Sequence, residues 1–151
     1  MTVWNGGAVQ TVDGQLVTFE VAHLHVALPV GAVREVVAAA TLTPAGAGGM
    51  LVGLLNLRGQ LLPVFSLRLA LRLPDIALEP RQYIVIADQG DTSCGLIVDR
   101  LGEVRSYEGA AIQPVDAAFG AGVVGAIHDG DRVLLLPAPD AIAGHQWSVE
   151  R

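Results

Sequence analysis

The sequence predicts an all-β protein made of two small barrels of about five strands each, with short helical turns and a shared hydrophobic core. Three observations carry this prediction. Apolar residues recur at a period of two in short segments, no segment sustains the period of a long helix, and the two halves of the chain resemble each other. Hydrophobic residues make up 52% of the 151 residues and charged residues 16%, so the chain can bury a large core.

The first half of the chain is expected to hold two antiparallel strand pairs. The apolar pattern predicts strands at residues 17–21, 24–30, 51–57 and 61–67. A polar break at Val33–Val36 ends the first pair, and a glycine-rich loop covers residues 43–49. Residues 58–60 join the second pair, and a short helical turn is expected at 67–71.

The second half repeats this order after a connector at 74–80. Strands are predicted at residues 83–87, 94–98, 123–128 and 133–136, with turns at 88–91 and 129–131. A second polar break at Leu101–Val104 follows its hairpin as the first break does, and a short helical stretch is expected at 139–142. This similarity predicts two lobes of like topology, each closed into a barrel that leaves no free sheet edge. The alternative is a coincidence among generic hairpins.

Charge and hydropathy exclude several classes of protein. The formal net charge is −6, and the nine basic residues, all arginine, are too scattered to neutralise several phosphates together, so we expect no nucleic-acid partner. The most apolar region, residues 50–73, is interrupted by three arginines, so direct membrane insertion is not expected. A cytoplasmic protein is the simplest interpretation.

No catalytic or metal-binding pattern stands out in the sequence. His23 and His25 lie two apart on a predicted strand and would share a face, but no carboxylate or third imidazole is near them in sequence. Cys94 lies in an apolar segment without a nearby cation and is expected to be a core residue. The glycine-rich loop is no P-loop because the chain has no lysine. We therefore expect no catalytic residue, no metal and no cofactor.

Arg58 is the most informative single residue. It lies between two strongly apolar strands, where a charge is costly to bury unless it is paired. A turn through Gly59 would expose it at the edge of a lobe, where Glu35 is the best candidate for an acidic partner, forming a partly shielded structural ion pair. The alternative is an ordinary surface arginine in a turn.

The segment around Arg58 resembles the signature of CheW, the bacterial chemotaxis coupling protein family. Residues 53–68 read Gly-Leu-Leu-Asn-Leu-Arg-Gly-Gln-Leu-Leu-Pro-Val-Phe-Ser-Leu-Arg. Further similar segments are residues 19–36, 95–104, 112–114 and 125–137. The resemblance covers roughly residues 16–143. Ser66 departs from it, because the family usually has an aspartate there, and the C-terminal helix common in the family looks short or missing.

The resemblance implies two intertwined SH3-like five-stranded subdomains in a CheW-like domain at residues 15–143, after a flexible leader at 1–14 and before a short tail at 144–151. It implies a non-enzymatic adaptor that binds the regulatory domain of a CheA-type histidine kinase and the cytoplasmic tip of methyl-accepting chemoreceptors, at arrays on the inner face of the membrane. The receptor-facing groove would then involve Val33, Arg58, Leu101 and Val104, with Glu35 positioning Arg58.

Two other classes of function are considered beside the adaptor. One is a small-molecule-binding regulatory domain that holds its ligand between the two lobes. The other is a cofactor-free hydrolase, which the lack of a poised nucleophile disfavours.

Overall fold

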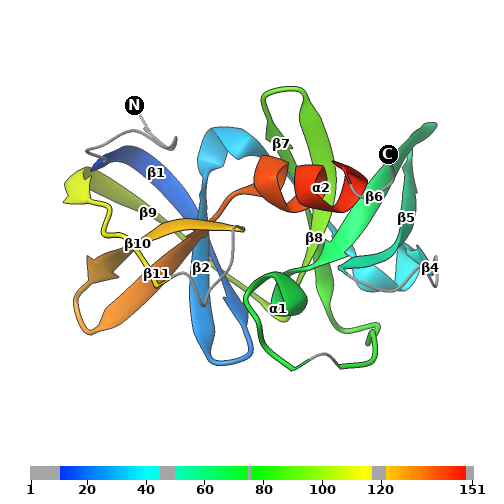
Figure 1. Cartoon of the computed structure of the whole chain (residues 1–151), viewed down its shortest axis with the longest axis horizontal. Coiled ribbons are helices and arrows are strands. Elements are labelled where there is room, and N and C mark those ends of the chain that lie inside the picture. Colours follow the sequence, from blue (N-terminus) through cyan, green and yellow to red (C-terminus); the bar gives the residue numbers. More distant parts are fainter. Residues whose placement is uncertain (1–10, 45–49, 75, 117–121, 149–151) are drawn as a thin grey trace.

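The computed structural model describes residues 11–44, 50–74, 76–116 and 122–148. It has two β lobes side by side (Figure 1). The strands are β1 (Thr11–Val21), β2 (Leu24–Pro29), β3 (Val33–Ala38), β4 (Thr43–Pro44), β5 (Leu51–Leu57), β6 (Gln60–Ser66), β7 (Tyr83–Gln89), β8 (Thr92–Val98), β9 (Arg100–Ala111), β10 (Val123–Asp129) and β11 (Arg132–Pro137). The helices are α1 (Leu67–Ala70) and α2 (Pro139–Ser148), with 3-10 turns η1 (Val30–Ala32) and η2 (Ala39–Thr41). The all-β prediction is confirmed.

Each lobe is built around one sheet. The terminal lobe, named for its strands near both ends of the chain, has the order β10-β11-β2-β1-β9, and the middle lobe has the order β3-β7-β8-β6-β5-β4. In both sheets the second strand of one hairpin runs parallel to the second strand of the other, β11 beside β2 and β6 beside β8. The repeat read from the sequence is therefore real, and the sheets are consistent with two SH3-like barrels.

The two lobes do not correspond to the two halves of the sequence. The β1–β2 hairpin belongs to the terminal lobe, but the strand that follows it, β3, pairs with β7 in the middle lobe. In the second half, the β7–β8 hairpin belongs to the middle lobe and the following strand, β9, pairs with β1 in the terminal lobe. Each half thus gives its third strand to the other lobe, so the lobes are intertwined.

Three hydrophobic cores explain why the strands read as nearly continuous apolar runs. The seam core lies between the lobes and takes side chains from both sheets, among them Phe19, Val26, Phe65, Val85, Leu96 and Leu135. Each lobe also has its own core, with Leu16, Ala27 and Leu134 in the terminal lobe and Leu62, Ile84 and Ile86 in the middle lobe. Alternate residues of β7 enter different cores, so this strand is buried on both faces and does not show a polar face.

Several predicted boundaries differ from the structure. The segments Val33–Val36 and Leu101–Val104 are parts of strands β3 and β9, not breaks between elements. The first strand begins at Thr11, inside the expected leader, and the last helix, expected at 139–142, continues to Ser148 in the expected tail. His23 lies in the β1–β2 turn and not on a strand beside His25. Helix α2 packs on β7 and β8 of the middle lobe.

Candidate functional site

A β-bulge in β3 puts Val33 and Val36 on the same face of the sheet. Val33 pairs with Ala87 of β7 and Val36 pairs with Val85. The two valines are three positions apart and their partners only two, so β3 carries one extra residue between them. In a regular strand, residues three apart point to opposite faces, and the extra residue cancels this. Both valines pack against the seam core.

The same irregularity occurs at the equivalent place in β9. Leu101 pairs with Phe19 of β1 and Val104 pairs with Val17, so three positions again oppose two. Leu101 and Val104 therefore share a face with Phe19 and Val17, both of which belong to or pack on the seam core. The alternation of the sequence is broken at both bulges, which is why neither segment could be recognised as a strand.

Thr18 and Gly102 hold the β9 bulge. Thr18 Oγ1 accepts a hydrogen bond from the Glu103 N–H at 2.9 Å and donates one to the Glu103 carbonyl oxygen at 2.9 Å, so both backbone groups of Glu103 are satisfied. A Cβ atom on residue 102 would lie 2.6 Å from the Thr18 carbonyl oxygen, a distance that real Cβ atoms essentially never show. Only glycine lets β9 approach β1 this closely.

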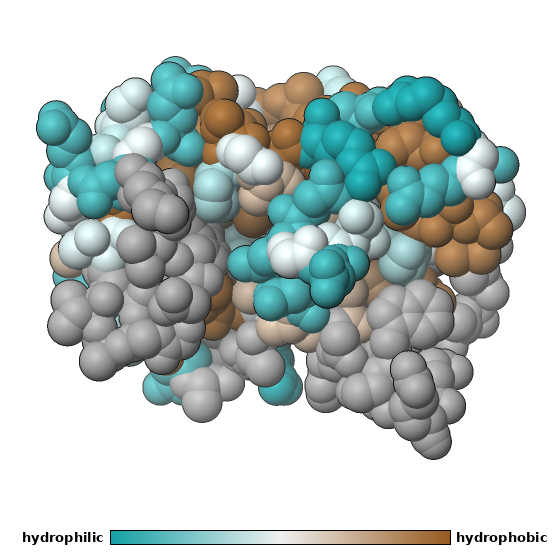
Figure 2. Space-filling view, turned by 90° about the horizontal axis from the view of Figure 1, so that it is seen from above, coloured by the Kyte–Doolittle hydropathy of each residue, from teal (hydrophilic) through white to brown (hydrophobic). Residues whose placement is uncertain are grey.

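Leu101 and Val104 extend the seam face to an exposed edge. They are 46% and 53% exposed, and β9 is the edge strand of the terminal sheet. Exposed large apolar side chains beside a buried core are typical of a contact surface. The other exposed large apolar residues in the described part of the chain are Val30, Leu54, Leu61, Ile76 and Val133. Seen from above, apolar surface interrupts the hydrophilic surface near the middle of the molecule and over the middle lobe (Figure 2).

Arg58 occupies a two-residue turn between β5 and β6. Its φ is 50° and that of Gly59 is 89°, as a type I′ hairpin turn requires, and Asn56 Oδ1 accepts a hydrogen bond from the Gly59 N–H at 2.9 Å. The Arg58 guanidinium pairs with the Glu35 carboxylate through Nη2 and Oε1. The Arg58 side chain is 71% exposed and that of Glu35 30%, so the arginine half of the pair is open to solvent.

The structure separates the four predicted receptor-facing residues into two groups. Val33, Leu101 and Val104 are on seam-facing sides of β3 and β9, and Val33 is partly buried. Arg58 and Glu35 are on the other side of β3, because the cross-strand partner of Glu35, Ile86, belongs to the middle-lobe core. That these residues form a receptor groove stays a prediction.

Arg34 forms a polar network that the sequence did not reveal. Its guanidinium donates to both carboxylate oxygens of Asp88, at 3.0 and 2.7 Å, and to Ser93 Oγ at 3.1 Å and Gln60 Oε1 at 3.2 Å. The hydrogen bonds from Arg34 hold the pKa of the Asp88 carboxyl below its usual value. Arg34 and Asp88 are 54 positions apart, so no local pattern could have joined them.

Asp99 connects the two lobes at the point where the chain crosses from β8 to β9. Its Oδ2 accepts from the Ala22 N–H at 2.7 Å and pairs with Arg68 Nη2 at 2.7 Å, and its Oδ1 accepts from Gln82 Nε2 at 2.9 Å. Burial raises the pKa of Asp99, but these hydrogen bonds and the charge of Arg68 outweigh it and leave the pKa below its usual value. Ala22, in a turn without the usual residues, has a φ of 56°, and Asp99 stabilises that conformation.

Ser66 stands where the resemblance led us to expect an aspartate. It is the N-cap of α1, and its Oγ accepts a hydrogen bond from the Leu69 N–H at 3.2 Å. Serine and aspartate are both good N-cap residues, so the substitution is compatible with the local fold.

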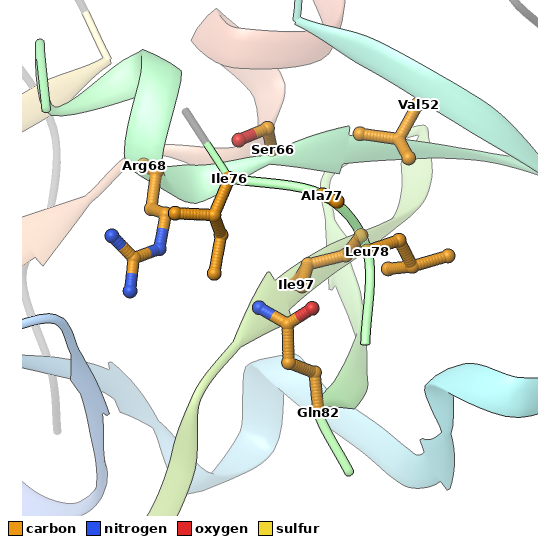
Figure 3. Close-up of a pocket in the computed structure, with 8 residues that line it drawn as sticks. All are labelled: Val52, Ser66, Arg68, Ile76, Ala77, Leu78, Gln82 and Ile97. Carbon is orange, nitrogen blue, oxygen red and sulfur yellow. The ribbon is translucent and has the colours of Figure 1, made fainter. Parts of the chain in front are cut away.

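A cavity of about 240 Å³ lies beside α1 in the middle lobe (Figure 3). Val52, Ile76, Leu78 and Ile97 form its apolar wall, with Ser66, Arg68 and Gln82 as polar neighbours. None of its lining residues lies on a strand of the terminal lobe. The cavity is therefore not the ligand site between the lobes that the small-molecule alternative requires.

The described residues contain no cluster of three or more His, Cys, Asp or Glu side chains that could hold a metal ion. Cys94 is buried, and burial raises the pKa of its thiol to about 12, so the thiol is protonated at neutral pH. No described helix is long and apolar enough to cross a membrane.

Comparisons with known proteins agree on one family. The model of the CheW-like domain matches residues 15–146. "Chemotaxis protein CheW" of Rhizobium meliloti (strain 1021) is 32% identical over 105 residues, which cover 66% of this chain and 65% of that protein. The match thus spans just under two thirds of that relative. The crystal structure of scaffolding protein TtCheW from Thermoanaerobacter tengcongensis has a TM-score of 0.73 at 24% identity and covers 84% of this chain and 85% of that chain, which shows the likeness of fold.

Proposed function

Because the chain belongs to the CheW-like domain family, we propose that it is a non-enzymatic adaptor coupling chemoreceptors to a CheA-type histidine kinase, in bacterial chemotaxis or a related chemosensory pathway. The relatives it resembles are named as a chemotaxis protein and as a scaffolding protein. Such a role needs surfaces that hold partners, and it needs no catalytic group. It would place the protein in the cytoplasm, at receptor arrays on the inner face of the membrane.

The exposed apolar pair on β9 is the observation that best supports receptor binding. A receptor tip is helical, and an amphipathic helix binds through apolar side chains spaced about one turn apart. Leu101 and Val104 offer two apolar side chains on one face of an edge strand, next to the seam core. We propose that this pair, with Val33 on β3, contacts the receptor tip, and that Arg58, oriented by Glu35, contributes a charge at the border of the surface.

The same role requires a second surface for the regulatory domain of the kinase. We propose that this second surface lies at the ends of the barrels, away from the receptor-facing residues. Separate surfaces allow one adaptor to hold both partners at once. The alternative of a small-molecule-binding domain is not favoured by the comparisons.

Reconstitution of kinase control tests the proposal. Autophosphorylation of the cognate kinase is measured with receptor-tip fragments in membranes or on vesicles, with and without this protein. We expect receptor-dependent kinase activity only when the protein is present. The proposal would be contradicted if receptor-dependent kinase activity were the same with and without this protein, or if the protein changed the activity of no CheA-type kinase of its own organism.

A further inference from the structure

A cavity in the terminal lobe corresponds to the place that the Arg34 side chain fills in the middle lobe. In the middle lobe, the guanidinium of Arg34 is held by Asp88, Ser93 and Gln60 at 2.7–3.2 Å. We call this group of four residues the Arg34 site. The bulge of β3 places Arg34 there, between the β7–β8 hairpin and the start of β6.

Strand pairing gives the equivalent residues in the terminal lobe. Glu20 and His25 are the last but one pair before the β1–β2 turn, as Asp88 and Ser93 are before the β7–β8 turn. Gln60 is the first residue after the β5–β6 turn, and its equivalent after the β10–β11 turn is Arg132. Gly102 and Glu103 occupy the bulge of β9 as Arg34 and Glu35 occupy that of β3.

These equivalents line a cavity of about 170 Å³. We call it the Gly102 cavity, and its lining includes Glu20, His25, Gly102, Glu103 and Arg132. The residue at the place of Arg34 is a glycine, so the chain supplies no side chain to fill the space. A Cβ there would collide with the backbone of Thr18, so the bulge cannot accept one without a shift.

We propose that the Gly102 cavity binds the guanidinium of an arginine side chain presented by a partner protein. Within the described part of the chain, the Glu20 side chain makes no hydrogen bond or ion pair, although Arg100 is its neighbour in the strand register of β1 and β9. A carboxylate is the natural partner of a guanidinium because two parallel N–H···O bonds can form, as Asp88 shows for Arg34. The cavity is smaller than the roughly 300 Å³ or more of small-molecule sites, which favours a single side chain as the occupant.

The remaining charges around the cavity are compatible with a bound cation. Arg132 adds a positive charge where the middle lobe has the neutral Gln60, but its Nη2 is directed to Asp129 Oδ2 at 3.2 Å. Arg105 pairs with Glu103 at 3.2 Å and with Asp129 at 3.4 Å. A bound guanidinium would approach Glu20 directly, with the neutral form of His25 as a further acceptor.

An NMR titration of the full chain, labelled with nitrogen-15, tests the proposal. The probe is Nα-acetyl-arginine methylamide, and the uncharged control probe is Nα-acetyl-citrulline methylamide. We expect saturable shifts of the amide signals of Glu20, Gly102 and Glu103 with the arginine probe only. Shifts that do not saturate, or that are equal for both probes, would overturn the proposal. Binding of free L-arginine more than about tenfold tighter than the arginine probe would also overturn it, because it would indicate an amino-acid ligand.

Matched variants in the two lobes sharpen the test. Glu20→Gln should weaken binding of the arginine probe about tenfold, because a charge-assisted pair is lost, and Arg132→Gln should strengthen it. Asp88→Asn, the equivalent change in the Arg34 site, should leave probe binding at Gly102 unchanged. An unchanged affinity of Glu20→Gln, or an equal loss in Asp88→Asn, would overturn the assignment. This test involves neither receptor nor kinase, so it can fail without affecting the proposed function.

Discussion

Glu35 and Glu103 occupy equivalent positions in two β-bulges, yet only Glu35 pairs with an arginine from the hairpin of its own lobe. Arg58 reaches Glu35 from the β5–β6 turn, whereas the equivalent turn residue of the terminal lobe is Gly130. Glu103 pairs instead with Arg105, two residues along its own strand, at 3.2 Å. The two lobes thus repeat one backbone plan and present different charges on it.

The Arg58–Glu35 pair should contribute little to stability. With Arg58 71% exposed, we expect a coupling energy of about 0.5 kcal/mol between Arg58→Ala and Glu35→Ala. Urea unfolding of the wild type, both single variants and the double variant measures it. The coupling should fall in 1 M salt because the charges are screened. A coupling energy above about 2 kcal/mol would mean that the ion pair is much more buried than it is in this structure.

Asp99 should contribute much more, and in a pH-dependent way. Asp99→Ala removes the carboxylate that accepts from Ala22 and Gln82 and pairs with Arg68, so we expect a loss of about 3 kcal/mol at neutral pH. Since the folded-state pKa of Asp99 is lowered, this contribution is present above the unfolded-state pKa of about 3.9 and is lost as the pH falls through the folded-state pKa.

The measurement is urea unfolding of wild type and Asp99→Ala between neutral and acidic pH. The difference between the two should shrink below about pH 4. Asp91→Ala, in the exposed β7–β8 turn, is the control and should change stability by less than about 0.5 kcal/mol. A difference that is independent of pH would mean that the charge of Asp99 does not matter.

Gly102 should tolerate no side chain. Gly102→Ala puts a Cβ 2.6 Å from the Thr18 carbonyl oxygen and should cost about 1–3 kcal/mol, because backbone has to move. Gly31→Ala is the control, since its Cβ would meet nothing within 4 Å. Thermal unfolding of both variants decides the point. Equal stability of the two variants would show that β9 does not approach the Thr18 backbone as closely as in this structure.

Local pattern predicted the hairpins well and the long-range pairing poorly. The strands on either side of each turn alternate or are continuously apolar, so their residues alone identified them. Strands β3 and β9 were missed because a bulge interrupts the alternation in each. Their exchange between lobes could not be read from either half, because the pairing of β9 with β1 joins segments far apart in the chain.

The candidate site was predictable only in part. The pairing of Arg58 with Glu35 was suggested by an isolated charge between apolar strands. The Arg34–Asp88 pair and the contact of Asp99 with Ala22 join residues 54 and 77 positions apart, and nothing in the local sequence marks them. The bulges that turn Leu101 and Val104 to one face became visible only through the strand register.

The seam-facing edge of β9 is the proposed binding surface for a receptor tip. Leu101→Asp is the most suitable variant, because Leu101 is 46% exposed and its replacement should leave the core intact. A substitution of Val33 would disturb the seam core, on which Val33 packs. Val133→Asp is the matched control, since Val133 is 44% exposed on β11, away from the β9 edge. A few central apolar contacts usually carry most of the binding energy.

The deciding measurement is a calorimetric titration of wild type, Leu101→Asp and Val133→Asp with a receptor-tip fragment and, separately, with the regulatory domain of the kinase. We expect Leu101→Asp to weaken receptor binding by about 2 kcal/mol or more and to leave kinase binding nearly unchanged, with Val133→Asp binding the receptor like wild type. A folded Leu101→Asp protein that binds the receptor tip as tightly as wild type would contradict the claim.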